Sequence, residues 1–392
     1  MECDVAVAGV GIAGAFTLRA LSKKLRVVGI DKREKLGYPV ECGELVPTKE
    51  EMKNLLPNLG DYSLFTLPEK YASNRTKYFE FVIPNGKSVE IDFDMLVINR
   101  DRFISEIAEG SNHKIMKRTK ILGFEKDEMF GKLKLRDLEK RQEYELKARV
   151  VVGSDGANSR IAKSLGVWKY EIAAAKQYVM KGVECDEETV YMFVGSKIAP
   201  GGYAWIIPKG KGVANVGVGV RQSFLKKGDS IHRVLERFVR EYPYSSRYLK
   251  GAEIIEKVGA VAPVDRPLDR TVYDNVLLAG DSASMILSHV AAGIPVSMIA
   301  GDVAGKVING WFEGEMELED YDRMWREKML DAMERSYRIK ELWDKISGTD
   351  ERLCKYFRFI SKRDMSLILR SRIPAKLRLA EPFIPLMNVV FS

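Results

Sequence analysis

The sequence of 392 residues predicts an α/β fold with two sheets and a helical C-terminal region. Three observations support this prediction. The first fourteen residues read as a buried strand and a glycine-rich turn, which is typical of a parallel nucleotide-binding sheet. The stretch 170–220 has no helical pattern and indicates the antiparallel sheet of a second domain. The stretch 318–379 is mostly helical by its pattern.

The turn after the first strand, residues 4–8, has the sequence G-x-G-x-x-G and is followed by a helical pattern. Gly9 permits a tight turn, Gly11 lets a pyrophosphate approach the backbone, and Gly14 lets the helix pack closely. A second predicted strand ends at Asp31, where an acid would meet a ribose hydroxyl. The motif alone is weak evidence, but this combination predicts a dinucleotide site in preference to a plain glycine-rich turn.

Composition excludes several classes of protein. No apolar run approaches the roughly 20 residues that span a bilayer, and the N-terminus enters a strand directly, so we expect no signal peptide. The four cysteines form no C-x-x-C pair and there are three histidines, so we expect a reducing cytoplasm and no metal site.

The net charge of +8 is concentrated at the C-terminal end. From Arg352 to Ser392 there are nine Lys/Arg and two acids, a net charge of +7. Leu, Ile and Phe are interleaved with these charges, as in interfacial helices that bind anionic lipid. A helical cap with a solvated basic face is the alternative. We expect no nucleic-acid partner, because no binding motif accompanies the charge.

Between the second strand and residue 99 the pattern predicts four features. Residues 32–44 read as a loop across the mouth of the nucleotide site. Thr48, with an acid three residues later, predicts a capped helix. Residues 78–91 predict a hairpin, and Asn99 is expected to cap a further helix.

Two further buried strands end in polar turns. The strand 150–152 runs into Asp155-Gly156, and the strand 275–279 runs into Gly280-Asp281. A long apolar helix then opens near Gly293, with a proline in its first turn. Because carboxyl ends of parallel strands meet at one edge of a sheet, these turns are expected to converge.

The second sheet is expected to contain strands over 189–194, 203–208, 213–220 and 254–262, with a helix over 231–242. Tyr203 and Trp205 alternate on one strand and therefore share a face. They are expected either to line a slot or to be plain core aromatics.

Three strand ends, 9–14, 155–156 and 280–281, resemble the FAD-binding signature of the glutathione-reductase-like flavoproteins of the p-hydroxybenzoate hydroxylase group. A Rossmann dehydrogenase would not need the second and third. The resemblance implies a glutathione-reductase-like FAD-binding domain with an antiparallel-sheet substrate domain. It implies that FAD is held by Gly9, Gly11, Ala13, Gly14, Asp31, Lys32, Cys42, Gly43, Arg100, Asp155, Gly156, Gly280, Asp281, Gly293 and Ile294.

Two stretches narrow the resemblance. Residues 200–208 are similar to the geranylgeranyl reductase motif Y-x-W-x-F-P, which is followed by a G-x-G met at Gly217 and Gly219. Residues 40–44 resemble the Cys-Gly-Glu loop of archaeal members of that family. The chain departs from the family where Ile207 replaces the motif's Phe, where 282–285 lack an Ala-Ala pair, and where 291–294 replace a Gly-rich helix entry. The resemblance implies substrate-binding roles for Tyr203, Trp205 and Pro208.

The implied reaction is the hydrogenation of C=C bonds in geranylgeranyl chains of membrane lipids or their precursors. It needs a hydride donor, a proton donor and a dry apolar slot. Cys42 is the expected catalytic residue, as proton donor or as a shaping group, while the other cysteines and His289 are expected to be structural. Glu44 is expected either to orient the loop or to be solvated. The helix start at Gly293 is expected to stabilise negative charge on reduced flavin.

Two alternatives stay open at this point. The same FAD frame suits a flavin monooxygenase or halogenase acting on an aromatic or apolar substrate, and a non-catalytic lipid- or flavin-binding protein would only sequester its ligand. No second G-x-G-x-x-G marks a nicotinamide domain, so the electron donor is left open between NADPH, ferredoxin and another carrier. We expect a cytoplasmic protein, and the basic tail leaves open a peripheral position at the membrane.

The expected domain organisation has three parts. The FAD-binding domain is expected to be discontinuous, with the substrate domain inserted into it and the basic region following both. The parts are 1–75, 95–168 and 263–315 for FAD, 76–94 and 169–262 for the substrate sheet, and 316–392 for the C-terminal region.

Overall fold

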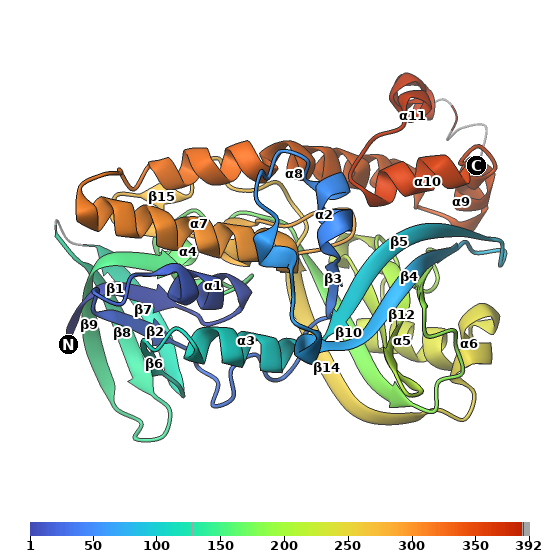
Figure 1. Ribbon diagram of the computed structural model, residues 1–392. Coiled ribbons are helices and arrows are strands. Elements are labelled where there is room, and N and C mark those ends of the chain that lie inside the picture. The colour runs from blue at the N-terminus through green and yellow to red at the C-terminus, as the bar shows by residue number, and fades with distance from the viewer. Residues whose placement is uncertain (127–128, 386, 388–392) are drawn as a thin grey trace.

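The computed structural model describes residues 1–126, 129–385 and 387. It contains two eight-stranded sheets side by side, with long helices along one side of the molecule and shorter ones at the C-terminal end (Figure 1). This is the α/β arrangement with a helical C-terminal region that the sequence predicts. The three-part division of the chain into domains stays a prediction.

The first sheet has the strand order β15-β16-β9-β1-β2-β6, with β7 and β8 continuing from β9 as a meander. β1, β2, β9 and β16 are parallel, and Val7 of β1 lies between Gly29 of β2 and Val152 of β9. The carboxyl ends of three of these strands therefore meet at one edge, as expected from the polar turns. The bounds are β1 Glu2–Ala8, β2 Val27–Ile30, β6 Lys114–Met116, β7 Thr119–Lys126, β8 Gly131–Asp137, β9 Glu143–Gly153, β15 Val272–Tyr273 and β16 Val276–Leu278.

Two helices pack backbone against backbone beside this sheet: α1 (Ile12–Ala20) and α7 (Ile294–Glu313). A Cβ atom on Gly301 would lie 2.2 Å from the Ala13 carbonyl oxygen, so only glycine allows this approach. The close packing holds the first turns of α1 and α7 beside each other. Both first turns contribute to the cavity described below.

α3 (Arg100–Glu109) lies against the opposite side of α1, with Phe16 and Phe103 in contact. Asn99 is its N-cap residue as predicted, but the Asn99 side chain makes no capping hydrogen bond. Thr48 does cap α2 (Lys49–Leu55), because its side chain accepts from the Glu51 N–H. α4 (Arg160–Ser164) follows β9.

The second sheet has the strand order β14-β10-β13-β12-β11-β4-β5-β3. The prediction of an antiparallel sheet holds for every pair except β11 and β4, which run parallel. The hairpin extends beyond the predicted 78–91, and β3 follows the predicted loop 32–44 in a stretch for which the sequence predicted no element. The bounds are β3 Leu45–Pro47, β4 Ala72–Val82, β5 Ser88–Ile98, β10 Ile172–Lys181, β11 Thr189–Phe193, β12 Tyr203–Gly210, β13 Val213–Val220 and β14 Glu253–Pro263.

The two faces of the second sheet have different partners. On β12, Ala204 and Ile206 pack into a core with α5 (Ile231–Glu236) and α6 (Pro243–Leu249). Trp205 and Ile207 point to the other face and join the core of the first sheet. The single helix predicted over 231–242 is divided, because a π-turn over 237–241 follows α5.

The C-terminal region consists of α8 (Asp320–Ile346), α9 (Asp350–Phe357), α10 (Lys362–Leu369) and α11 (Ala375–Ala380). No helix in the part of the chain that the structure describes is long and apolar enough to cross a membrane. α8 is attached to the second sheet by an ion pair between Arg221, after β13, and Asp344. It is attached to the first sheet at its other end.

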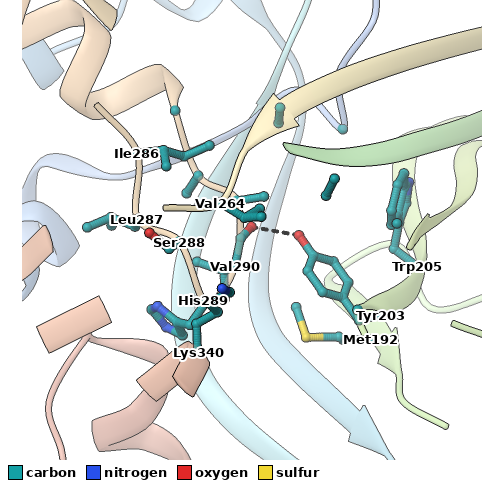
Figure 2. A pocket seen from close by; sticks show the side chains of 18 of the residues that line it. Met192, Tyr203, Trp205, Val264, Ile286, Leu287, Ser288, His289, Val290 and Lys340 are labelled. Atoms are coloured by element: carbon teal, nitrogen blue, oxygen red, sulfur yellow. Dashed lines mark hydrogen bonds between the residues drawn. The ribbon is translucent and has the colours of Figure 1, made fainter. Parts of the chain in front are cut away.

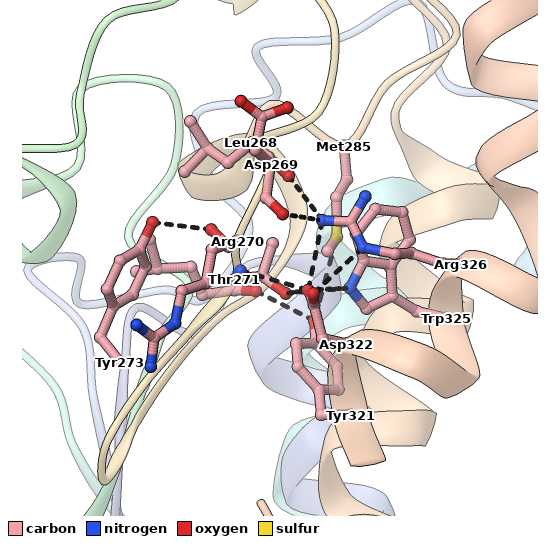
Figure 3. A network of polar contacts seen from close by, with 11 residues as sticks. Leu268, Asp269, Arg270, Thr271, Tyr273, Met285, Tyr321, Asp322, Trp325 and Arg326 are labelled. Carbon is pink, nitrogen blue, oxygen red and sulfur yellow. Dashed lines mark hydrogen bonds and ion pairs between the residues drawn. The ribbon is translucent and has the colours of Figure 1, made fainter. Parts of the chain in front are cut away.

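That second attachment is a compact polar network (Figure 3). Asp322 accepts from the Thr271 hydroxyl at 2.5 Å and from the Trp325 indole N–H at 3.2 Å. Arg326 pairs with Asp322 at 3.1 Å and donates to the Leu268 carbonyl at 2.8 Å. α8 is thus fixed at both ends and extends along one side of the molecule from the first sheet to the second (Figure 1).

Candidate functional site

One cavity of about 710 Å³ lies between the two sheets and the C-terminal helices, a volume typical of small-molecule sites. Its lining begins at the first turn of α1, passes the face of β12 and the first turn of α7, and continues to α8–α11. Figure 2 shows part of it, where Tyr203 points toward the loop that carries His289 and Val290, and Trp205 lies on the other side of Tyr203. The cavity therefore joins the predicted cofactor loops to the C-terminal helices.

The glycine-rich turn has the conformation that its sequence predicts. Gly9 has a φ of +95°, and a Cβ atom there would lie 2.5 Å from the Ser154 carbonyl oxygen. A Cβ on Gly14 would lie 2.0 Å from the Gly9 carbonyl oxygen, whereas a Cβ on Gly11 would meet no atom within 4 Å. Gly11 is also the N-cap of α1, and no side chain caps this helix. The first N–H groups of α1, beside Ala13, therefore face open space, as a bound diphosphate requires.

Asp31 supports this turn from the end of β2. Its carboxylate accepts from the Val10 N–H at 3.0 Å and from the Arg33 N–H at 2.8 Å. Neither Asp31 nor the exposed Lys32 lines the cavity, although Asp31 is bonded to the turn that does. The ribose contact expected of Asp31 stays a prediction.

Asp155 has a local structural partner. Its carboxylate accepts from the Ser159 hydroxyl and the Arg160 N–H, both at 2.5 Å, and so holds the start of α4. Burial raises the pKa of Asp155, while these hydrogen bonds oppose the shift. The neighbouring Ser154 and Gly156 line the cavity and Asp155 does not. The structure thus brings the turn to the cavity but not the carboxylate itself.

Asp281 has the opposite environment. It lines the cavity, and its carboxylate makes no hydrogen bond with any residue that the structure describes. Burial raises the pKa of Asp281 to about 6, and the nearby Arg100 guanidinium opposes this shift. Arg100 also lines the cavity, and its buried Nε lacks a hydrogen-bond partner among the described residues. Unsatisfied buried groups of both signs indicate a polar ligand.

The first turn of α7 completes this polar end. Gly293, Ile294 and Pro295 line the cavity, with Pro295 in the first helical turn as predicted. The N-cap Gly293 provides no side-chain cap, and a Cβ atom there would lie 3.2 Å from Asp281 Oδ1. Gly280, with a φ of +71°, turns the chain before Asp281. The positive end of α7 is therefore directed at the cavity.

The Cys42 loop, residues 40–44, crosses the cavity beside these groups. Cys42 and Gly43 line it, and the Cys42 sulfur accepts from the Glu44 N–H at 3.2 Å. Burial raises the pKa of Cys42, so its thiol is protonated at neutral pH. The structure therefore suits a proton donor better than a thiolate nucleophile at this position.

Glu44 anchors the Cys42 loop, which settles the alternatives left open from the sequence. It is 2% exposed and adopts a φ of +68°. Its carboxylate accepts from the Arg100 N–H at 3.1 Å and the Asn215 side-chain amide at 2.9 Å, and it pairs with Lys209. Since these partners come from α3, β13 and β12, Glu44 joins the loop to both halves of the molecule.

Gln177 on β10 is a residue of the site that the sequence did not single out. Its amide donates to the Cys42 carbonyl at 3.1 Å, and its side-chain oxygen accepts from the Trp205 indole N–H at 3.0 Å. Gln177 thus connects the aromatic wall to the Cys42 loop. Nothing in its local sequence could have indicated this, because both partners are remote in the chain.

Tyr203 and Trp205 line the cavity as predicted, with their ring centroids 5.7 Å apart. The Tyr203 hydroxyl donates to the Val290 carbonyl at 2.6 Å, as Figure 2 shows, and burial raises the pKa of Tyr203. Pro208 does not line the cavity, because the strand alternation turns it to the opposite face. A Cβ atom on Gly217 would lie 2.4 Å from the Trp205 ring, which explains a glycine there.

Most of the remaining cavity wall is apolar, and Arg221, Lys340 and Lys376 add charged side chains to it. It includes phenylalanines and methionines of the second sheet and aliphatic side chains of the C-terminal helices. His289 lies in the wall, with Nδ1 2.7 Å from the Ser336 hydroxyl, and burial lowers its pKa to about 4. His289 is therefore neutral at physiological pH, which adds no charge to this wall.

The sequence and the fold were compared with known proteins. Residues 171–262 match the family model of the geranylgeranyl reductase catalytic domain. A digeranylgeranylglycerophospholipid reductase of Methanocaldococcus jannaschii is 33% identical over 366 residues, covering 88% of each chain. A protein of that name from Methanothrix thermoacetophila is 29% identical over 97% of each chain.

Two solved structures show the same fold at lower identity. A geranylgeranyl bacteriochlorophyll reductase-like protein of Thermoplasma acidophilum has a TM-score of 0.81 and 23% identity, covering 97% of this chain and 99% of that one. CmlS, a flavin-dependent halogenase, has a TM-score of 0.66 and 18% identity, covering 93% of this chain and 72% of that one. The sequence relatives say more about function than the halogenase does, because proteins that share one fold can catalyse different reactions.

Proposed function

This chain belongs to the family of digeranylgeranylglycerophospholipid reductases, and from that premise we propose that it is an FAD-dependent reductase of C=C bonds in the geranylgeranyl chains of membrane lipids or their precursors. The observation that carries the proposal is one continuous cavity. It has unsatisfied polar groups at the cofactor end and apolar side chains toward the C-terminal helices. A dinucleotide and a long hydrocarbon chain fit these two ends respectively.

The residues present fit FAD. The uncapped N-terminus of α1 at Gly11 would hold the diphosphate, and the partnerless carboxylate of Asp281 would accept from the ribityl hydroxyls. Arg100, with its orphaned Nε, would meet an anionic or carbonyl oxygen. The first turn of α7 would stabilise negative charge on the ring system. The cofactor-binding roles expected of Asp31, Lys32 and Asp155 are kept as proposals.

Saturating a C=C bond takes a hydride and a proton, and bound reduced flavin supplies the hydride. Cys42 would supply the proton, because burial keeps its thiol protonated and the sulfur faces the cavity. Tyr203 and Trp205 would position the chain and exclude water. Pro208 lies outside the cavity wall, so its proposed role is limited to the shape of β12.

The basic C-terminal region suggests where the lipid comes from. Nine Lys/Arg against two acids follow residue 351, and the apolar end of the cavity lies among the same helices. We propose that the enzyme acts at an anionic membrane surface, as a peripheral protein on the cytoplasmic side. The three-part domain division predicted from the sequence is also kept as a proposal.

The decisive experiment is an anaerobic incubation of the purified protein with FAD, dithionite and a geranylgeranyl phospholipid in detergent. Mass spectrometry of the extracted lipid is expected to show a gain of two hydrogens for each double bond reduced. NADPH and reduced ferredoxin, tested in place of dithionite, identify the electron donor. Lipid that is unchanged while the flavin stays reduced would contradict the proposal and favour a lipid- or flavin-binding protein.

Two controls sharpen this assay. Cys42→Ala is expected to lose at least 100-fold in reduction rate while retaining FAD, since a positioned proton donor contributes roughly 100- to 10,000-fold. Cys185→Ala changes a half-buried cysteine outside the cavity and is expected to match the wild type. An aerobic run that coupled NADPH oxidation to oxygen uptake without lipid reduction would instead support a monooxygenase.

A further inference from the structure

α11 has apolar side chains on both of its faces. Its inner side chains, Leu377 and Ala380, line the cavity, together with Ile384 just beyond the helix. On the outer side, Leu379 is 75% exposed, and Phe383, in the short turn after the helix, is 60% exposed. Large apolar side chains that are exposed beside basic ones are typical of helices that lie at a membrane interface. The inner face has its cover in the cavity, and the outer face has none among the described residues.

A third exposed apolar residue is held beside α11. Phe359, in the turn between α9 and α10, is 61% exposed, and its carbonyl accepts from Lys376 Nζ at 2.5 Å. Lys376 also pairs with Asp364 of α10 at 2.5 Å. Phe359 and Lys376 are exposed and line the cavity as well, so the cavity reaches the surface at this point. The exposed apolar side chains thus surround an opening.

The charge around this opening is positive. Arg358, Arg363 and Arg378 are exposed and form no ion pair within the described part of the chain. The two acids of the region are already neutralised, Asp364 by Lys376 and Glu381 by Arg338 at 2.7 Å. Basic side chains beside exposed aromatic and aliphatic ones are the combination that binds anionic bilayers.

A second copy of this chain suits the surface less well. In a symmetric dimer the same patch meets itself, so the three arginines of each copy would face those of the other. Few exposed apolar side chains are present, whereas a stable dimer buries about 800 Å² on each partner. Charge and size both favour a lipid surface.

We propose that the exposed side chains around this opening form a docking surface for an anionic bilayer. The surface consists of Phe359, Leu379 and Phe383 together with Arg358, Arg363 and Arg378. It places α11 in the headgroup region, so that a lipid chain passes directly from the membrane into the cavity. The passage of substrate rests on the proposed function. Docking itself does not, and it is measured without any reaction.

The test is co-flotation of the full-length holoprotein with vesicles. Vesicles of phosphatidylglycerol and phosphatidylcholine are compared with vesicles of phosphatidylcholine alone. Wild-type protein is expected to float with the anionic vesicles and to dissociate as salt is raised. Leu379→Ser/Phe383→Ser is expected to weaken binding at least about tenfold, since each side chain loses the burial of a large apolar group. The triple variant Arg358→Gln/Arg363→Gln/Arg378→Gln is expected to lose on the order of 100-fold, from about a fivefold contribution by each charge.

Ile255→Ser is the matched control, because Ile255 is an exposed apolar residue of β14 outside the docking surface. It is expected to bind like the wild type. Equal binding by the Leu379/Phe383 variant, or dimers in light scattering that this variant abolishes, would overturn the proposal. Reduction of detergent-dispersed lipid is expected to be unchanged in all three variants, so a failure of docking is distinguished from a failure of the proposed function.

Discussion

Replacing Glu44 with glutamine is expected to destabilise the protein by about 3 kcal/mol, because it removes one member of a buried ion pair. The Glu44 side chain is 2% exposed and that of Lys209 is 17% exposed, so the Lys209 ammonium would be left nearly buried without a counter-charge. Breaking a fully buried pair costs roughly 3–5 kcal/mol, and the residual exposure of Lys209 places this one at the lower end. The amide nitrogen of glutamine would also replace one of the two carboxylate oxygens, so it would face either the Arg100 N–H or the Asn215 amide, both of which donate in the native protein.

The measurement is urea unfolding of Glu44→Gln against the wild type. The matched control is Glu41→Gln in the same loop. The Glu41 carboxylate pairs with Arg33 at 2.9 Å but its side chain is 40% exposed, so this variant is expected to lower the free energy of unfolding by less than about 1 kcal/mol. Adding Lys209→Met to Glu44→Gln is expected to recover more than half of the loss, since no charge then remains unpaired. A Glu44→Gln variant within about 0.5 kcal/mol of the wild type, or no recovery in the double variant, would refute the reasoning.

Three further predictions follow. Burial raises the pKa of Asp281 from 3.8 to about 6. Between these pH values the folded ligand-free protein keeps a proton that the unfolded chain releases. Asp281 therefore opposes folding increasingly as the pH rises from 3.8 to about 6, and its full unfavourable contribution is present above that range. Asp281→Asn is therefore expected to stabilise the ligand-free protein by up to about 3 kcal/mol near neutral pH, a gain that urea unfolding should show shrinking toward pH 4. Gly217→Ala places a methyl group 2.4 Å from Trp205, so it is expected to lower the free energy of unfolding by about 2 kcal/mol, measured by thermal unfolding, and to lower the reduction rate. Its control is Gly219→Ala, whose methyl group has its nearest contact at 3.6 Å and is expected to cost under about 1 kcal/mol. In Gly11→Ala the added methyl group meets no protein atom within 4 Å, so the free energy of unfolding is expected to stay within about 1 kcal/mol of the wild type. The purified variant is expected to contain at least tenfold less FAD by absorbance, because the methyl group occupies the place of the diphosphate.

The parts of the site that could be predicted from the sequence are those whose geometry is local. The turn from Gly9 to Gly14 is set by steric contacts within a few residues and its strand, and the structure has the tight φ and the close packing that the motif predicts. Asp281 lies at a strand end that must reach the same edge as the first turn, because parallel strands share their direction. Both features follow from short-range chemistry and sheet geometry.

The parts that could not be predicted depend on contacts between remote segments. Glu44 meets Lys209 and Asn215 more than 160 residues further along the chain. Gln177 similarly bridges Cys42 and Trp205. A carboxylate in a glycine-rich loop has the same local pattern whether it is solvated or buried, so only the tertiary structure decides between these alternatives. The same reason applies to the parallel pairing of β11 with β4, since hydrophobic alternation fixes a strand but not its neighbour.

The basic C-terminal region is packed on the protein as a cap, and the interfacial role proposed for it is compatible with this packing. Arg370, the residue that follows α10, pairs with Glu51 of α2 through two contacts, at 2.6 and 2.8 Å, which fixes this region to the body of the protein. The inner side chains of α11 then close the apolar end of the cavity, while Leu379 and Phe383 face outward. Because α11 and the turn that follows it form both the wall of the cavity and the exposed surface, a lipid held there as proposed would lie beside the opening. Extraction of a chain would then need no passage through water, where each exposed methylene would cost about 0.8 kcal/mol.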